Sequence, residues 1–141
     1  MYLVDANVLS RLTVEERRSR FVRSHCRVPS EVLYETRGMA DRALLSRIEL
    51  PMDTGTLLAL KRVMAWLDPD DRALVDLYRN KGNADPILVA AALAASDGGP
   101  ALWETTWVVV TDDGAVRACA STFGVPWLSR SGLTDLIVER P

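Results

Sequence analysis

Short apolar runs alternate with longer stretches of helical periodicity along this chain. The first run, residues 1–4, stops at Asp5-Ala6-Asn7, as is typical of a buried strand that ends in a turn. Similar short runs predict further strands at 26–29, 48–51, 107–111 and 125–128. The stretches between them predict helices at about 13–24, from Ser30 past Glu35, and at 57–67, 73–78, 86–95, 114–123 and around 133–137.

The start and stop signals of several helices are clear. Asp85-Pro86 opens the most apolar helix, with an acid at the cap and proline at the first helical position. Residues 87–95 are apolar on every side, so we expect this helix to be buried. Ser30 is expected to cap the second helix, and Gly124 to close the helix at 114–123.

The helix predicted at 57–67 carries a single apolar stripe. Polar Lys61 and Arg62 lie on the opposite side of this helix. The residues expected to face the core are Leu57, Leu60, Val63, Met64 and Leu67.

Strands and helices alternate from one end of the chain to the other. Such alternation favours an α/β fold with a mainly parallel sheet covered on both faces. There is no internal repeat, no low-complexity tract and no obvious linker, so we expect a single domain over residues 1–141.

Composition places the chain among ordinary globular proteins, since 48% of its 141 residues are hydrophobic and 26% are charged. No apolar run approaches the roughly 20 residues that span a bilayer, so no membrane partner is expected. The first residues do not resemble a secretion signal. Cys26 and Cys119 are too few for a disulfide scaffold, and we expect a cytoplasmic protein with reduced thiols.

The formal net charge of −2 argues mildly against bulk nucleic-acid binding. The basic residues are nevertheless concentrated in one early stretch. Part of this stretch has two interpretations: Arg17, Arg18, Arg20 and Arg23 bind RNA phosphates or an acidic partner, or they form a solvated helix face with Glu15 and Glu16. The whole arginine-rich stretch comprises Arg11, Arg17, Arg18, Arg20, Arg23 and Arg27.

Acidic residues fall where strands end or helices begin. Asp5 ends the first predicted strand, and Asp112-Asp113 end the strongest later one. Asp85 begins the buried helix, and Glu35 lies in an earlier helix. Ligand sites in parallel α/β sheets gather at the carboxyl ends of strands, so these carboxylates are expected to converge.

Converging carboxylates repel one another, raise one another's pKa and oppose folding. A hard divalent cation removes this conflict, and oxygen ligands suit magnesium or manganese. Such an ion binds phosphate and activates water, so the pattern indicates a carboxylate-and-metal nuclease without a catalytic histidine.

Each acid also has a purely structural interpretation. Asp5 and the pair Asp112-Asp113 are suited to turns, and Asp85 is suited to a helix cap. Glu35 taken singly is typical of a solvated helix charge. The metal site is therefore an inference from the whole set.

Four segments resemble the motifs of PIN-domain proteins. Residues 3–9 (LVDANVL) resemble the opening motif, and residues 28–35 (VPSEVLYE) the second. Residues 84–90 (ADPILVA) and 108–113 (VVVTDD) resemble the third and fourth, the last with the Thr-x-Asp spacing of that family. The resemblance runs from residue 1 to about residue 128.

This resemblance implies a PIN-like three-layer α/β/α fold and a ribonuclease dependent on Mg²⁺ or Mn²⁺. The short chain is most similar to a VapC-type toxin of a toxin–antitoxin pair, which implies an RNA substrate, an antitoxin protein as partner and a possible homodimer. The acids that it assigns to catalysis and metal binding are Asp5, Glu35, Asp85 and Asp113, with Asp112 as a competing fourth ligand.

Two other classes of function compete with this one. A PIN-like scaffold without catalysis would act as a protein- or RNA-binding module, but all four acidic positions are filled here. A receiver domain or a haloacid-dehalogenase-type phosphatase also uses an acidic pocket. The phosphatase would need Asp-x-Asp after the first strand, where this chain has Asn7 in the second position.

Overall fold

The computed structural model describes residues 1–66, 84–97 and 105–140, apart from the side chains of Ala84 and Asp85. Its centre is a five-stranded sheet in which every pair of neighbours is parallel, in the order β3-β2-β1-β4-β5. The predicted parallel sheet is confirmed. The strands are β1 (Tyr2–Val4), β2 (Cys26–Pro29), β3 (Glu49–Leu50), β4 (Val108–Val110) and β5 (Trp127–Leu128).

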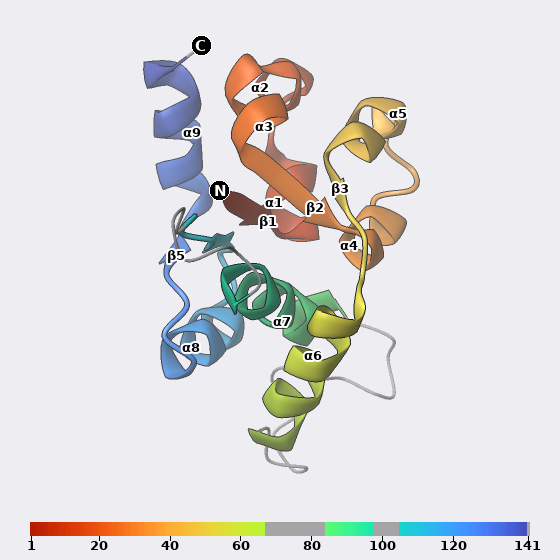
Figure 1. The fold of residues 1–141 in the computed structure, drawn as a ribbon. Helices are drawn as coiled ribbons and strands as arrows, with labels where there is room; N and C mark the ends of the chain where they lie inside the picture. Colours follow the sequence, from red (N-terminus) through yellow and green to blue (C-terminus); the bar gives the residue numbers. More distant parts are fainter. Residues whose placement is uncertain (67–83, 98–104, 141) are drawn as a thin grey trace.

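Helices cover both faces of this sheet. Figure 1 shows α2, α3 and α9 on one side of the sheet and α6, α7 and α8 on the other, which gives three layers. The α-helices are α1 (Ala6–Arg11), α2 (Val14–Arg18), α3 (Arg20–His25), α4 (Ser30–Glu35), α5 (Arg42–Leu45), α6 (Thr54–Trp66), α7 (Ala84–Asp97), α8 (Gly114–Thr122) and α9 (Arg130–Glu139), and one 3₁₀ turn spans Ser46–Ile48.

The two central strands are buried on both faces. In β1, Leu3 pairs with Val109 of β4, and Val4 pairs with Val110. All four side chains are almost completely buried, as is typical of parallel strands packed between two helical layers. This burial holds the carboxyl ends of β1 and β4 next to each other.

The buried helix predicted from its uniform apolarity is confirmed as α7. Residues 86–92 are all buried, and α7 contacts β1, β2, β4 and α4. The helix begins at Ala84, so Asp85 is its second residue and not the residue that precedes it. The prediction that Asp85 is the residue capping this helix was therefore wrong.

The predicted helix at 13–24 is two helices separated by Ser19. The Ser19 side chain accepts a hydrogen bond from the backbone N–H of Val22, which starts α3. Thr13 and Glu16 form a reciprocal capping box at the start of α2. A serine that caps a new helix thus interrupts the periodicity.

Ser30 does not cap α4, contrary to the prediction. It is the first helical residue, and its hydroxyl donates to Glu49 Oε1 at 2.7 Å. Pro29 occupies the cap position and makes no side-chain hydrogen bond there. The Ser30 side chain therefore links the end of β2 to β3.

The apolar stripe predicted for α6 is only partly the buried face. Val63 is buried, but Leu57 and Met64 are 53% and 42% exposed. The helix approaches α7 through small residues, since a Cβ on Gly55 would lie 3.7 Å from Ala94 Cβ. This close approach, which also buries Ala59, rotates the larger side chains outward. Leu67 and the helix predicted at 73–78 lie outside the described residues.

The last predicted elements are confirmed. Gly124, with φ of +69°, follows α8, where the left-handed region favours glycine. Leu133 and Ile137 of α9 are buried against the core. No helix within the described ranges is long and apolar enough to cross a bilayer.

Candidate active site

Asp5 lies at the carboxyl end of β1, where the strand passes into α1. Its backbone N–H donates to Val110 O of β4 at 3.1 Å, which continues the sheet by one residue. Its Oδ1 accepts from the backbone N–H of Asn7, and this bond caps α1. Only 2% of Asp5 is exposed, so the carboxylate has one fixed position.

Thr111 links Asp5 to the acid at the end of β4. The fully buried Thr111 hydroxyl donates to Asp5 Oδ2 at 2.8 Å and accepts from the backbone N–H of Asp113 at 3.1 Å. One side chain therefore positions two carboxylate-bearing segments. Sequence reasoning used residues 111–113 only to find the acid, although their Thr-x-Asp spacing also pointed to this threonine.

Asp113 is the cap residue of α8. Its Oδ1 accepts from the backbone N–H groups of Ala115 at 2.7 Å and Val116 at 3.2 Å. No described residue donates to its Oδ2. The same carboxylate can therefore cap the helix through one oxygen and offer the other to a ligand.

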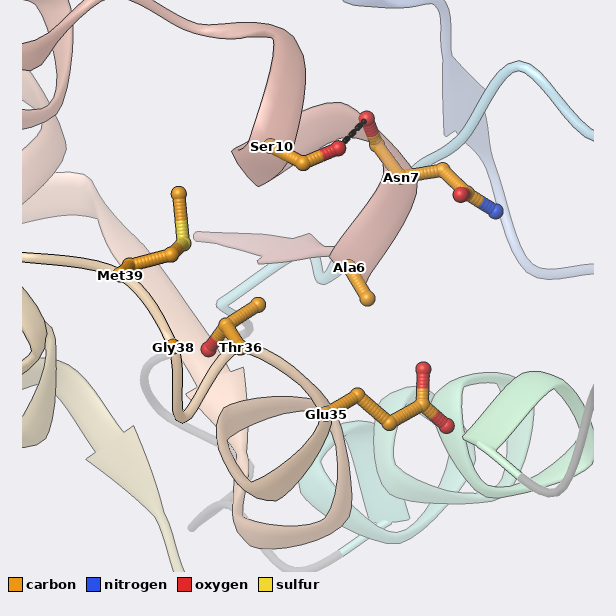
Figure 2. A pocket seen from close by; sticks show the side chains of 7 residues that line it. All are labelled: Ala6, Asn7, Ser10, Glu35, Thr36, Gly38 and Met39. Atoms are coloured by element: carbon orange, nitrogen blue, oxygen red, sulfur yellow. Dashed lines mark hydrogen bonds between the residues drawn. The ribbon is translucent and has the colours of Figure 1, made fainter.

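Glu35 is the last residue of α4, which follows β2 on the other side of β1. Figure 2 shows its carboxylate pointing away from α4 and below Ala6, in the direction of the light-green turn of α7. Glu35 borders an open pocket of about 300 Å³. The other residues of this pocket are Ala6, Asn7, Ser10, Thr36, Gly38 and Met39.

The electrostatic surroundings of these acids are unfavourable. Burial raises the pKa of Asp5, the negative charge of Asp113 raises it further, and the hydrogen bonds from Thr111 and Asn7 act against this. Partial burial also raises the pKa of Glu35, and the charge of Asp5 adds to that shift. Glu35 and Asp113 thus each lie within electrostatic reach of Asp5, which stands between them in the order of the strands.

No cation within the described residues neutralises this group. None of the ion pairs formed there includes Asp5, Glu35 or Asp113. The described part of the chain also contains no three histidine, cysteine or acidic side chains that already surround a common point at metal-binding distances. The fourth predicted acid, Asp85, has no described side chain.

Asp112 has different surroundings from Asp113. Its Oδ1 accepts from the backbone N–H of Arg130 at 3.0 Å and from Arg117 Nη2 at 3.3 Å. Its Oδ2 lies 3.8 Å from Arg11 Nη1 and 3.9 Å from Arg130 Nε. Of the two consecutive aspartates, Asp113 is therefore the one linked to Asp5, and Asp112 is paired with arginines.

The arginines predicted as one RNA-binding group do not form one. Arg17 is buried, and its guanidinium donates to both carboxylate oxygens of Asp41, at 2.7 and 3.1 Å. The prediction that Arg17 contacts phosphate or solvent was therefore wrong. Arg18, Arg20 and Arg23 are exposed on α2 and α3.

Comparison with known proteins leaves the family open. No family model matches the chain, and no curated protein or solved structure matches it. The α/β/α architecture is a finding of the structure, whereas the PIN-like identity stays a prediction from the four motifs.

Proposed function

We propose that this protein is a divalent-metal-dependent endoribonuclease that hydrolyses phosphodiester bonds in RNA. The observation that supports the proposal most strongly is the gathering of Asp5, Glu35 and Asp113 at the carboxyl end of a parallel sheet. Their charges oppose one another, and no described cation balances them.

The donor set suits Mg²⁺ or Mn²⁺. Asp5, Glu35 and Asp113 supply carboxylate oxygens, which hard cations prefer, and Asp85 at the start of α7 completes the set that the sequence predicts. A bound ion of this kind would polarise a phosphate and lower the pKa of a bound water.

The surrounding residues support such a site from outside it. Thr111 and the backbone N–H of Asn7 hold the Asp5 carboxylate in one orientation. The Thr111 hydroxyl also fixes the backbone that carries Asp113. Outer hydrogen bonds of this kind orient carboxylate ligands and strengthen metal binding.

The proposal is tested by cleavage of labelled single-stranded RNA with Mn²⁺, with Mg²⁺ and with a chelator. We expect cleavage only with metal, and we expect Asp5→Asn to lower its rate by more than the 10- to 100-fold typical of losing an outer partner. Asp53→Asn is the matched control, because Asp53 accepts from Thr56 at the start of α6 and lies outside the acid group.

Each outcome of this experiment has a clear meaning. A wild-type protein that binds RNA but never cleaves it with either metal would favour the non-catalytic scaffold. Equal rates for wild type and Asp5→Asn would show that the acid group is not the active centre.

The motif resemblance further supports a role as the toxin of a type II toxin–antitoxin pair, acting in the cytoplasm and restrained by an antitoxin. Expression of the chain alone should then arrest growth, and Asp5→Asn should not. A growth arrest that persists in Asp5→Asn would exclude RNA cleavage as its cause.

A further inference from the structure

A second charged group lies beside the acids, and the proposed chemistry does not use it. It consists of Arg11, Arg117 and Arg130 around Asp112, and we call it the arginine cluster. Within the described residues, three guanidinium groups share this one carboxylate. The cluster therefore carries more positive than negative charge.

The arginine cluster lies at the same edge of the sheet as the acids. Arg130 follows β5, and Arg117 lies on α8, whose cap is Asp113. Arg117 Nε donates to the backbone oxygen of Thr111 at 3.1 Å, the residue whose hydroxyl binds Asp5. Asp112 of the cluster and Asp113 of the acid group are therefore consecutive residues, and both lie at the β4 and β5 side of the sheet.

The arginines keep hydrogen-bond donors for a ligand. The contacts of Arg11 and Arg130 side chains with Asp112 are 3.8 and 3.9 Å long, beyond hydrogen-bond length. The Arg11 and Arg130 side chains are 62% and 43% exposed, although Arg130 Nε itself is buried and is not one of the donors that a ligand could reach. An arginine has five N–H donors in a planar fork that matches phosphate oxygens.

An exposed aromatic ring belongs to the same surface. The Arg117 guanidinium lies 4.8 Å from the centre of the Trp127 ring, and Trp127 is 43% exposed. Its indole N–H donates to Ser121, which fixes the ring on the surface. Guanidinium groups beside an exposed aromatic ring are the combination with which proteins bind single-stranded nucleic acid, through phosphate contacts and base stacking.

We propose that the arginine cluster and Trp127 bind the RNA strand next to the phosphate that is cleaved. Arg11 and Arg130 contact a neighbouring phosphate, and Trp127 stacks on a base. Asp112 positions the guanidinium groups and takes no part in metal binding. This inference rests on the proposed ribonuclease function. It places the RNA strand along the edge of the sheet, on a path from β5 toward β1 and β2.

The test measures RNA binding with a chelator present, so that cleavage does not interfere. The probe is a fluorescent single-stranded RNA of about 12 nucleotides, a length within the usual range for such surfaces. We expect Arg11→Gln and Arg130→Gln each to weaken binding several-fold. Each should also lower the slope of log K against log salt by about 0.7. Trp127→Leu should weaken binding about fivefold or more, with little change in that slope.

Arg23→Gln is the matched control. Arg23 is also an exposed arginine, but it lies in the last turn of α3, just before β2 and thus near the amino edge of the sheet. Arg11 is 62% exposed at its side chain, so its replacement leaves the fold intact. Equal effects of Arg11→Gln and Arg23→Gln would overturn the proposal, as would wild-type protein that binds no RNA.

Two further measurements separate this inference from the proposed function. With metal, Arg11→Gln and Arg130→Gln should raise KM more than they lower kcat. Wild-type cleavage with unchanged KM in both variants would refute the cluster and leave the ribonuclease standing. Poly-glutamate that binds as tightly as RNA, with the same loss in Arg11→Gln, would assign the cluster to an acidic protein partner instead.

Discussion

The consecutive residues Asp112 and Asp113 have different surroundings, so we expect opposite effects when each is replaced by asparagine. Asp113→Asn should abolish metal-dependent cleavage while the protein stays folded, because asparagine caps a helix about as well as aspartate. Asp112→Asn should keep the cleavage step and cost about 1 kcal/mol of unfolding free energy, through weakened contacts with its arginines. Cleavage rates and urea unfolding of both variants check this. Lost cleavage in Asp112→Asn with retained activity in Asp113→Asn would reverse our assignment of the fourth acid.

The buried ion pair between Arg17 and Asp41 links α2 to the start of α5. Arg17 Nη1 also donates to the backbone oxygens of Leu9 and Leu12. Arg17→Met should lower the free energy of unfolding by about 3 kcal/mol, because it leaves Asp41 buried without its partner. Arg20→Met is the control, since Arg20 is an exposed arginine on α3, and urea unfolding at pH 7 is the measurement.

The same pair predicts a pH dependence of known sign. The hydrogen bonds and charge of Arg17 hold the pKa of Asp41 below its ordinary value of 3.8. The stabilisation is therefore complete above that value and is lost as the pH falls through the lowered pKa of the folded state. The difference between wild type and Arg17→Met should be full at pH 7 and should shrink as the pH falls below 3.8. A difference that does not change with pH would mean that Arg17 acts only through packing.

For single residues, the positions of the acids could be predicted from the sequence better than the surroundings of the arginines. Asp5 and Asp113 were located because strand ends in a parallel sheet meet at one edge. The burial of Arg17 could not be predicted in the same way, because it depends on Asp41, a partner 24 residues further along the chain. The arginine cluster was missed for a similar reason, since three helices bring its members together.

At the scale of elements, α9 depends on the absence of a side chain at its third residue. A Cβ on Gly132 would lie 2.5 Å from Leu128 Cδ1 and 2.9 Å from Leu128 Cγ. Gly132→Ala should therefore destabilise the protein by about 1–2 kcal/mol, although alanine is the better helix former. Gly114→Ala is the control, because nothing lies within 4 Å of a Cβ at the first residue of α8. Thermal melting of both variants decides, and equal melting temperatures would contradict the close contact.

Strands were predicted more reliably than helix faces. Short apolar runs identified all five strands, because buried parallel strands carry apolar residues on both faces. The buried face of α6 was partly wrong, since it is set by the small residues through which α6 meets α7 and not by the largest side chains. The break at Ser19 was also missed, because a serine inside an amphipathic pattern is as typical of a solvated helix position as of a helix cap.

For the whole molecule, metal should stabilise the fold. A ligand that binds only the folded state adds about 2.7 kcal/mol at 100 times its dissociation constant. Millimolar Mn²⁺ should therefore raise the melting temperature by about 5 °C or more, and Asp5→Asn should remove most of this rise. Asp53→Asn should keep it, because Asp53 lies on α6 outside the acid group. A melting temperature indifferent to Mn²⁺ in the wild type would contradict a working metal site.

The hydrogen bond between Thr111 and Asp5 joins residues 106 positions apart, and this separation matters while the protein is being synthesised. On the ribosome, β1 emerges early but lacks its neighbour β4 until residues 108–110 have left the exit tunnel. A nascent chain stalled before that point contains Asp5 and Glu35 but neither Thr111 nor Asp113. The proposed ribonuclease activity therefore requires that most of the chain has been made, and until then it would not act on the messenger that is being translated.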